Sequence, residues 1–286
     1  MAQAQFRAAL ADAATRVETS LDTLLPSGHR IADAMRYAVL NGGKRLRAFL
    51  VIESAALFDV PKSRADATAA AIECVHAYSL VHDDLPAMDN DDLRRGLPTV
   101  HIKWDDATAV LAGDALQAVA FEILADSNAP VALIASLAKA AGGTGMVRGQ
   151  DMDIAAETAA TPLNLAQIST LQSLKTGALI RWSAGAGAVL AGKDPAPLFE
   201  YAEAVGAAFQ IRDDILDIEG DPKAAGKRLR KDAVAGKATF VSLLGMDAAK
   251  TRAAELVDQA NTALAPYGTS ADNLRQAAQY TITRVT

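Results

Sequence analysis

Aspartate pairs are the residues of this sequence best suited to chemistry, and they occur four times, at positions 83–84, 91–92, 105–106 and 213–214. Asp105-Asp106 stands directly before an apolar helical run, where a carboxylate can cap free backbone N–H groups, so we interpret that pair as structural. Asp91-Asp92 lies in the charged stretch DNDDLRRG and fits solvated surface. The remaining two pairs end long apolar segments, HAYSLVHDDLPAMD and AAFQIRDDILD, and are the candidates for chemistry.

Helix geometry indicates how these two acidic ends could bind a cation. Asp213 and Asp217 are four residues apart and share one helical face, whereas Asp214 is turned away by about 100°. Asp83 and Asp89 bracket Pro86, which disturbs helical geometry between them. Carboxylates gathered at the end of an apolar helix are costly unless a cation compensates them, and an all-oxygen ligand set favours Mg²⁺. Either pair alone could be a cap or a surface pair, but two pairs at similar helix ends favour a metal-dependent site.

The elements that carry these motifs are predicted to be helices. The chain has 286 residues, of which 51% are apolar and 63 are alanine, the best helix former. Apolar residues recur at helical spacing in a series of runs, while no alternating strand runs, Ser/Gly linker or repeat is found. We therefore predict an all-α fold, with residues 1–286 forming a single domain of about ten or more helices. The runs are Ala2–Leu25, Ile31–Leu40, Leu46–Leu57, Ala67–Leu85, Ala107–Leu124, Val131–Ala141, Leu165–Leu190, Leu198–Ile218 and Ala248–Leu264.

Charge and cysteine content exclude several classes of protein. A net charge of −6 disfavours nucleic acid or an anionic membrane surface as partner. The one cysteine, Cys74, cannot form an internal disulfide and lies in an apolar helix, so we interpret it as a core thiol. The first 25 residues do not resemble a signal peptide, and the most apolar runs are shorter than a membrane span. We expect a cytoplasmic protein with no membrane span.

Seven segments, in this order, resemble the trans-type polyprenyl diphosphate synthases, most closely the bacterial farnesyl diphosphate synthases. The similarity covers nearly the whole chain. It implies an all-α bundle around a deep central cavity, the isoprenoid synthase fold, with two aspartate-rich helix ends facing each other, and a homodimer. The segments are GGKRLR (42–47), ECVHAYSLVHDDLPAMDNDDLRRGLPTVH (73–101), LAGDAL (111–116), GMVRGQDMD (145–153), LKTGALI (174–180), FQIRDDILD (209–217) and GKATF (236–240).

The resemblance assigns roles to individual residues. Asp83, Asp89 and Asp213 match magnesium ligands, supported by Asp84, Asp214 and Asp217, and three Mg²⁺ ions are expected with bound diphosphate. Arg94, Lys175 and Lys237 match the cations that hold the allylic diphosphate. The isopentenyl diphosphate site matches Lys44, Arg47, His76 and Arg95. Thr176 and Gln210 match positions near the developing carbocation, and Lys227 matches a flexible-loop lysine.

The sequence departs from the family pattern at two places near its end. Val241 stands where the family usually has proline, and the chain ends ITRVT instead of in a basic tail, which leaves Arg284 as the one cation there. We assign Arg284 no role. The segment Gly220–Lys237 is polar, glycine-punctuated and basic, and we expect an exposed loop that closes when diphosphate and Mg²⁺ bind.

The activity implied is head-to-tail condensation of isopentenyl diphosphate with dimethylallyl and geranyl diphosphates to give farnesyl diphosphate. The alternatives are a geranylgeranyl diphosphate synthase, a class I terpene cyclase and a non-enzymatic helical interaction protein. Asp213–Asp217 and GGKRLR argue against the cyclase. We expect Tyr78 and Ser79, about 6–7.5 Å below the metal end of this helix, to limit product length. In the family, an aromatic residue at this position goes with fifteen-carbon products.

We predict that Asp83→Ala or Asp213→Ala lowers turnover by several orders of magnitude and leaves the helical fold intact, because each removes a carboxylate that positions Mg²⁺. Asp105→Ala is the control: it should cost about 1 kcal/mol of stability through loss of a helix cap and leave turnover unchanged. Steady-state kinetics and circular dichroism of the three variants test this. A folded but inactive Asp105→Ala enzyme would show that the pairs have been sorted wrongly.

Overall fold

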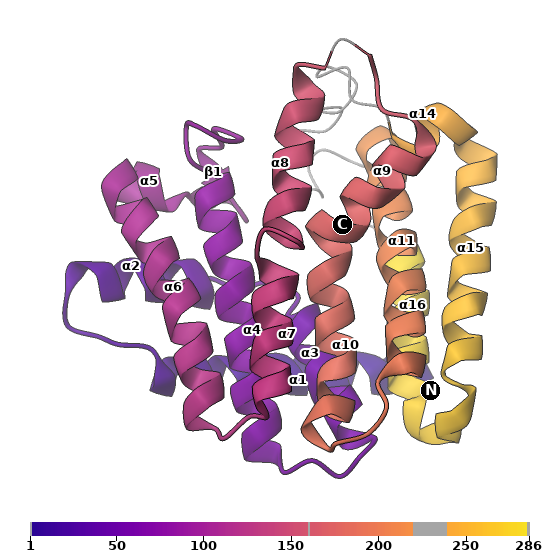
Figure 1. Cartoon of the computed structure of the whole chain (residues 1–286), viewed down its shortest axis with the longest axis horizontal. Helices are drawn as coiled ribbons and strands as arrows, with labels where there is room; N and C mark the ends of the chain where they lie inside the picture. Colours follow the sequence, from indigo (N-terminus) through magenta and orange to yellow (C-terminus); the bar gives the residue numbers. More distant parts are fainter. Residues whose placement is uncertain (1, 160, 220–238, 285–286) are drawn as a thin grey trace. The chain divides into compact units, whose positions relative to one another are not determined.

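A computed structural model describes residues 2–159, 161–219 and 239–284 of the chain (Figure 1). Contacts divide the chain into two compact units: the first contains residues 3–134 and 186–193, and the second contains residues 135–185 and 194–286. Helices dominate both units, which confirms the all-α prediction. The assignment of residues 1–286 to a single domain and the central cavity stay predictions.

The first unit is built around α4, which packs against α3 and α6. Phe6 of α1 meets Phe49 of α3 edge to face, with ring centroids 5.5 Å apart. Gly187 of α10 lies so close to α3 that a Cβ atom there would be 2.2 Å from the carbonyl carbon of Ser54. Small residues are therefore needed at this contact. The helices are α1 (Ala2–Leu24), α2 (Arg30–Leu40), α3 (Leu46–Ala56), α4 (Lys62–Asp83), α5 (Val100–Lys103), α6 (Asp106–Asp126), the start of α7 (Val131–Ala141) and the end of α10 (Ala178–Leu190).

The second unit is built around α11, which runs beside α15 and also contacts α16 (Figure 1). Tyr201 of α11 is fully buried and donates its hydroxyl hydrogen to the carbonyl of Leu274 at 2.8 Å, which ties α11 to α16. A π-helical turn, η1, joins α9 to α10. The elements are the rest of α7, α8 (Met146–Glu157), α9 (Leu165–Gln172), η1 (Ser173–Gly177), the start of α10, α11 (Ala196–Glu219), α14 (Phe240–Leu244), α15 (Met246–Ala263), the 3₁₀ helix η2 (Ala265–Ala271) and α16 (Asp272–Thr283).

The nine predicted helical runs agree with the structure to within a few residues, with Leu165–Leu190 divided among α9, η1 and α10. Sequence periodicity missed α5, α8, α14 and α16, which are short or have polar residues on most of their surface. It also missed a two-residue hairpin of β1 (Leu93–Arg94) and β2 (Leu97–Pro98). The turn between these strands is Arg95-Gly96, and both residues have positive φ, of 54° and 77°, as a type I′ hairpin turn requires.

Asp105 caps α6 as predicted. Its side chain accepts a hydrogen bond from the backbone N–H of Thr108 at 2.7 Å and forms an ion pair with Arg30. Cys74 is fully buried, and burial raises the pKa of its thiol, which confirms a core role. His82 of α4 lies 3.1 Å from the carbonyl oxygen of Val110 on α6, so the imidazole is part of the contact between these two helices.

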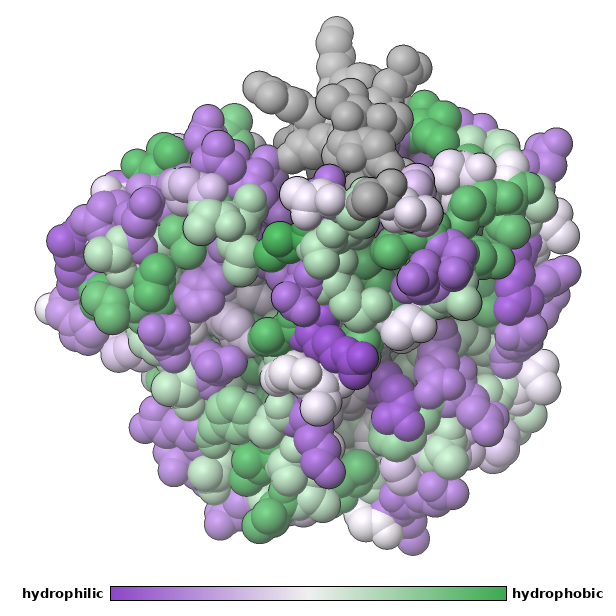
Figure 2. Space-filling view, turned by 45° about the horizontal axis from the view of Figure 1, so that its top comes forward, coloured by the Kyte–Doolittle hydropathy of each residue, from purple (hydrophilic) through white to green (hydrophobic). Residues whose placement is uncertain are grey.

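One described helix, α6, is long and apolar enough to cross a membrane, although the sequence analysis expected none. Half of the apolar stretch in that helix is buried inside the structure, and the core helix of a soluble protein meets the same criteria, so a single such helix is weak evidence for a span. On the face drawn in Figure 2, hydrophobic residues are scattered among hydrophilic ones.

Candidate active site

The first acidic motif lies at the C-terminal end of α4, where Asp83 is half-buried and Asp89 is exposed. The backbone N–H of Asp89 donates to the carbonyl of Asp83 at 2.8 Å, so the turn after α4 folds back onto its last residue. This turn brings the two aspartates of the motif near each other despite Pro86. The two carboxylates expected to bind metal are thus held at one helix end.

Asp84, in contrast, is buried and accepts hydrogen bonds from another side chain of the protein. Arg94 of β1 donates from Nε to both carboxylate oxygens of Asp84, at 2.8 and 2.9 Å, and from Nη2 to Oδ1 at 2.5 Å. Burial raises the pKa of Asp84, and the hydrogen bonds from Arg94 oppose that shift. The pair fixes the hairpin against the end of α4. Arg94, expected to hold a diphosphate, is paired with a carboxylate here.

Cations gather around His76 in the first unit. Arg47 Nη1 lies 3.3 Å from His76 Nε2, and the Arg47 Nε donor is buried and has no hydrogen-bond partner among the described residues. Arg95 donates a hydrogen bond from Nη1 to the backbone carbonyl of Gly42. The Arg95 guanidinium also lies against Gly43, where a Cβ atom would be only 2.9 Å from the guanidinium carbon. Gly43 also has φ of 123°, which favours glycine. An unpartnered buried donor among cations is the arrangement expected of an anion site.

The same cations set the charge of His76. Burial, followed by the charges of Arg47, Arg95, Arg94 and Arg45, lowers the pKa of His76 well below its usual value. The imidazole is therefore neutral at pH 7 and can accept a hydrogen bond from Arg47. Arg45 itself is buried and pairs with Glu73 at 3.2 Å, so it is part of the framework of this cluster.

Tyr78 and Ser79, the residues predicted to limit product length, lie on α4 between His76 and the acidic end of the helix. Tyr78 is buried, hydrogen-bonds with Gln117 of α6, and meets His82 edge to face with ring centroids 5.8 Å apart. Ser79 donates its hydroxyl hydrogen to the carbonyl of His76 at 2.9 Å. The ring of Tyr78 is thus held in place by two neighbours, while Ser79 is bonded to its own helix.

The second acidic motif lies on α11, and its three aspartates have different surroundings. Asp214 is buried and accepts hydrogen bonds from the backbone N–H of Phe240 at 2.7 Å and from Gln210 Nε2 at 3.1 Å. It therefore anchors the start of α14. Asp213 and Asp217 are half-buried on the neighbouring face, as their spacing predicted.

Asp213 forms an ion pair with Arg284, the residue to which the sequence analysis assigned no role. This contact was not expected from the sequence. Arg284 is 8% exposed, and its guanidinium lies 3.9 Å from the centroid of the Phe209 ring. Sequence could not show this pair because 71 residues separate its members.

The π-helical turn η1 presents Lys175 and Thr176, both half-buried. Lys175 Nζ forms an ion pair with Asp153 of α8 at 2.7 Å. The turn is in direct contact with α8, since a Cβ atom at Gly149 would be 2.2 Å from the backbone nitrogen of Lys175. Gln150, in the same motif of α8, has both amide atoms buried with no partner among the described residues. Asp153 and Gln150 were not singled out by sequence reasoning, although the motif GMVRGQDMD contains both.

The fit of these side chains to Mg²⁺ can be judged from their surroundings. Among the described residues, no three His, Cys, Asp or Glu side chains converge into a group that could bind a metal alone. Mg²⁺ usually takes one or two carboxylates and fills its other positions with water and substrate phosphates. Asp83 and Asp89, at one helix end, and Asp213, which pairs with a cation, could each supply a carboxylate to such an ion. Asp84 and Asp214 are instead engaged by protein groups.

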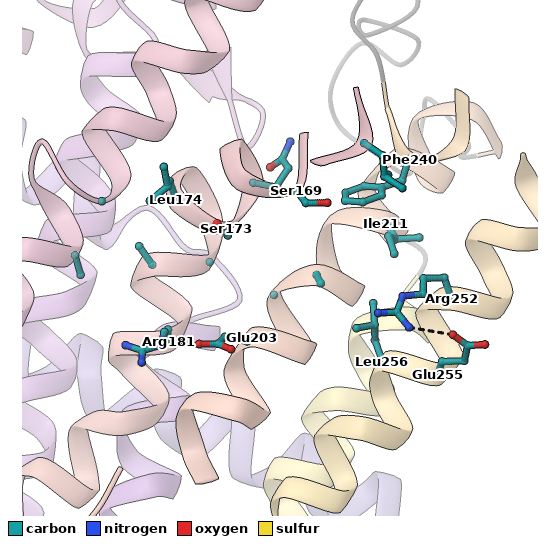
Figure 3. A pocket seen from close by; sticks show the side chains of 18 of the residues that line it. Ser169, Ser173, Leu174, Arg181, Glu203, Ile211, Phe240, Arg252, Glu255 and Leu256 are labelled. Atoms are coloured by element: carbon teal, nitrogen blue, oxygen red, sulfur yellow. Dashed lines mark hydrogen bonds and ion pairs between the residues drawn. The ribbon is translucent and has the colours of Figure 1, made fainter. Parts of the chain in front are cut away.

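A pocket of about 1260 Å³ lies within the second unit, between α9, η1, α10, α11, α14 and α15 (Figure 3). Arg181 and Glu203 meet at 3.0 Å along its wall, and Arg252 pairs with Glu255 at the same distance. Among the predicted site residues that the structure describes, none lines this pocket, although Phe240, bonded to Asp214, does. We do not place the chemistry in it.

Comparisons with known proteins place this arrangement in a family. The sequence model described as polyprenyl synthetase matches residues 29–278. The chain belongs to this family. The farnesyl diphosphate synthase of Escherichia coli is 47% identical over 245 residues, 82% of this chain and 81% of that protein. An FPP/GFPP synthase from Zymomonas mobilis, solved without ligand, is 45% identical, with a TM-score of 0.89 over 99% of this chain and all of that one.

The family also includes relatives named for a longer product. A chloroplastic geranylgeranyl pyrophosphate synthase of Catharanthus roseus is 39% identical over 92% of this chain and 76% of its own length. The predictions of an isoprenoid synthase fold and of a prenyltransferase are confirmed by the family and by these relatives. The roles of single residues stay predictions. The whole predicted loop Gly220–Lys237, with Lys227 and Lys237, lies outside the described residues.

The low pKa of His76 predicts a pH dependence of stability. The unfolded chain binds a proton at His76 at higher pH than the folded chain does, so this residue lowers the free energy of unfolding as pH falls below about 6.5. His76→Gln should reduce that fall by up to about 1.4 kcal/mol per pH unit. Urea unfolding at pH 7.5, 6.5 and 5.5 measures both slopes, and identical slopes would contradict the prediction.

Proposed function

We propose that this prenyltransferase condenses isopentenyl diphosphate with dimethylallyl diphosphate and then with geranyl diphosphate, giving farnesyl diphosphate. The observation that carries the proposal is the cationic cluster around His76 on the same unit as the acidic end of α4. The buried Arg47 Nε donor lacks a protein partner there, and an anionic substrate would supply one. Neither a helical interaction protein nor a terpene cyclase has a use for a second diphosphate site.

In this proposal the cluster binds isopentenyl diphosphate. Arg47 and Arg95 contact its diphosphate, together with Lys44, which is exposed at the start of the GGKRLR segment. Neutral His76 accepts a hydrogen bond from Arg47 and so keeps that guanidinium aimed at the anion. The framework pair Arg45–Glu73 neutralises itself and leaves the other cations for the substrate.

The allylic diphosphate is assigned to the acidic motifs and their cations. Asp83, Asp89, Asp213 and the supporting Asp217 would hold Mg²⁺, which would stabilise the charge that grows on the leaving diphosphate. Arg94 and Lys175 add positive charge, and the pairs with Asp84 and Asp153 fix where each cation lies. We assign Thr176 and Gln210 to the neighbourhood of the allylic cation because they match family positions there.

The chemical step follows from these placements. The C1–O bond of the allylic diphosphate breaks, and the double bond of isopentenyl diphosphate attacks C1, which forms the new carbon–carbon bond. A proton then leaves the carbon next to the resulting cation and restores a double bond. The departed pyrophosphate is the proposed acceptor of that proton, because no protein base is assigned there.

Pyrophosphate release tests this function directly. With geranyl diphosphate and Mg²⁺ alone the enzyme should release almost none, and adding isopentenyl diphosphate should start release together with fifteen-carbon product, identified by mass. Release that does not need isopentenyl diphosphate would indicate a cyclase. The absence of release under both conditions would contradict an enzyme of this class.

Product length depends on Tyr78 in this proposal. We predict that Tyr78→Ala shifts the product toward twenty carbons or more, since removing the ring deepens the space below the metal end of α4. Tyr78→Phe is the matched control: it keeps the ring, loses only the hydrogen bond with Gln117, and should leave the product unchanged. Mass analysis of products measures all three enzymes. A twenty-carbon product from the wild type, or no change in Tyr78→Ala, would place the limit at another residue.

We further infer a cytoplasmic homodimer. Val110 and Leu111 are 42% and 53% exposed on α6, a helix whose other face is buried, and such a pair of apolar side chains suits a protein partner. Sedimentation at micromolar concentration should show a dimer. A monomer under these conditions would contradict the inference.

A further inference from the structure

The last described turn of the chain is clamped onto α11. The backbone carbonyl of Arg284 accepts hydrogen bonds from Arg212 Nε at 3.1 Å and Arg212 Nη2 at 2.6 Å. The Arg284 side chain lies over the Phe209 ring, and its Nη2 donates to the Phe209 carbonyl at 3.3 Å. Backbone and side chain are thus held by separate contacts, and the guanidinium has a defined position.

That position puts Nη2 of Arg284 on Oδ1 of Asp213. Asp213 is one of the carboxylates proposed to coordinate Mg²⁺. The two cations would compete for the same carboxylate, because a guanidinium in contact with a ligand oxygen both occupies one of its lone pairs and repels a divalent ion. Arg284 is nearly buried, so solvent screens this repulsion less than it would at the surface.

We propose that Arg284 is a positioning residue that holds Asp213 as its counter-ion in the metal-free enzyme, and that Mg²⁺ binds this carboxylate by displacing the guanidinium. Arg284 thereby sets the Mg²⁺ concentration that the second acidic motif requires. The inference rests on the proposed function, since it takes Asp213 as a metal ligand.

The other contacts of Arg284 make this exchange local. Arg212 holds the backbone carbonyl of Arg284, so the end of the chain stays on α11 while the side chain turns. The contacts that Arg284 already makes with the Phe209 ring and carbonyl do not involve Asp213, so loss of the carboxylate leaves the guanidinium with other partners. Displacement therefore needs side-chain rotation rather than unfolding of α16.

The test measures Mg²⁺ binding without turnover. Unfolding temperature is followed as MgCl₂ is added at saturating inorganic pyrophosphate, and the half-saturating Mg²⁺ concentration is read from the curve. Arg284→Gln should lower that concentration about threefold to tenfold, and the difference should shrink at high KCl. Arg284→Lys keeps the charge and should stay near the wild type. Arg252→Gln removes an exposed, ion-paired arginine of the same unit and should not change the value.

The outcomes separate this inference from the proposed function. If Arg284 were merely structural, both of its variants would lower the metal-free unfolding temperature and leave the half-saturating concentration unchanged, which would overturn the inference alone. A wild-type enzyme that Mg²⁺ and pyrophosphate do not stabilise would overturn the proposed metal site as well.

A second measurement covers the case in which Arg284→Gln does not fold. The ¹⁵Nε resonance of Arg284 in the wild type, assigned by its loss in Arg284→Lys, should shift over the same range of Mg²⁺ concentration as the unfolding temperature. A resonance that does not move at saturating Mg²⁺ would contradict displacement.

Discussion

Compensation of clustered like charges is the constraint on which the rest of this structure depends. Carboxylates placed together at a helix end repel one another, and their desolvation adds to the cost unless cations lie close by. In the chain as described, arginine and lysine supply those cations: Arg94 for Asp84, Arg284 for Asp213 and Lys175 for Asp153. Arg284 and Asp213 are 71 residues apart and Lys175 and Asp153 are 22 apart, so these acidic residues also tie separate helices together.

The complementary problem arises around His76, where arginines outnumber the carboxylates that could neutralise them. Glu73 takes up Arg45, and Asp84 takes up Arg94, which leaves Arg47 with a buried Nε donor that no described group satisfies. A fold that keeps such a donor loses stability. In the proposed function a bound diphosphate would recover that loss, so the stability of this unit and its affinity for an anion would depend on the same residues.

The long helices could be predicted from sequence, because regularly spaced apolar residues mark both the extent of a helix and its buried face. The runs that became α1, α4 and α11 carry their buried faces in the sequence, and Asp105 caps α6 through a contact three residues away. The aspartate motifs were recognisable for the same reason, since their members lie within one or two helical turns. What was missed depends on distant contacts: the pairing of Arg284 with Asp213, and of Lys175 with Asp153 across the π-helical turn. The spacing of residues in the sequence also could not show that Arg94 donates hydrogen bonds to Asp84, because that contact depends on how the hairpin folds back onto α4.

The central claim is that the acidic helix ends exchange protein cations for divalent metal when a diphosphate binds. Crystals grown with MnCl₂ and inorganic pyrophosphate test it most directly, because anomalous scattering locates Mn²⁺ without reference to the protein atoms. The account predicts anomalous peaks on the carboxylates of Asp83, Asp89 and Asp213, with the Arg284 guanidinium moved off Asp213. Bound pyrophosphate with no metal at these carboxylates, or with Arg284 still on Asp213, would contradict it.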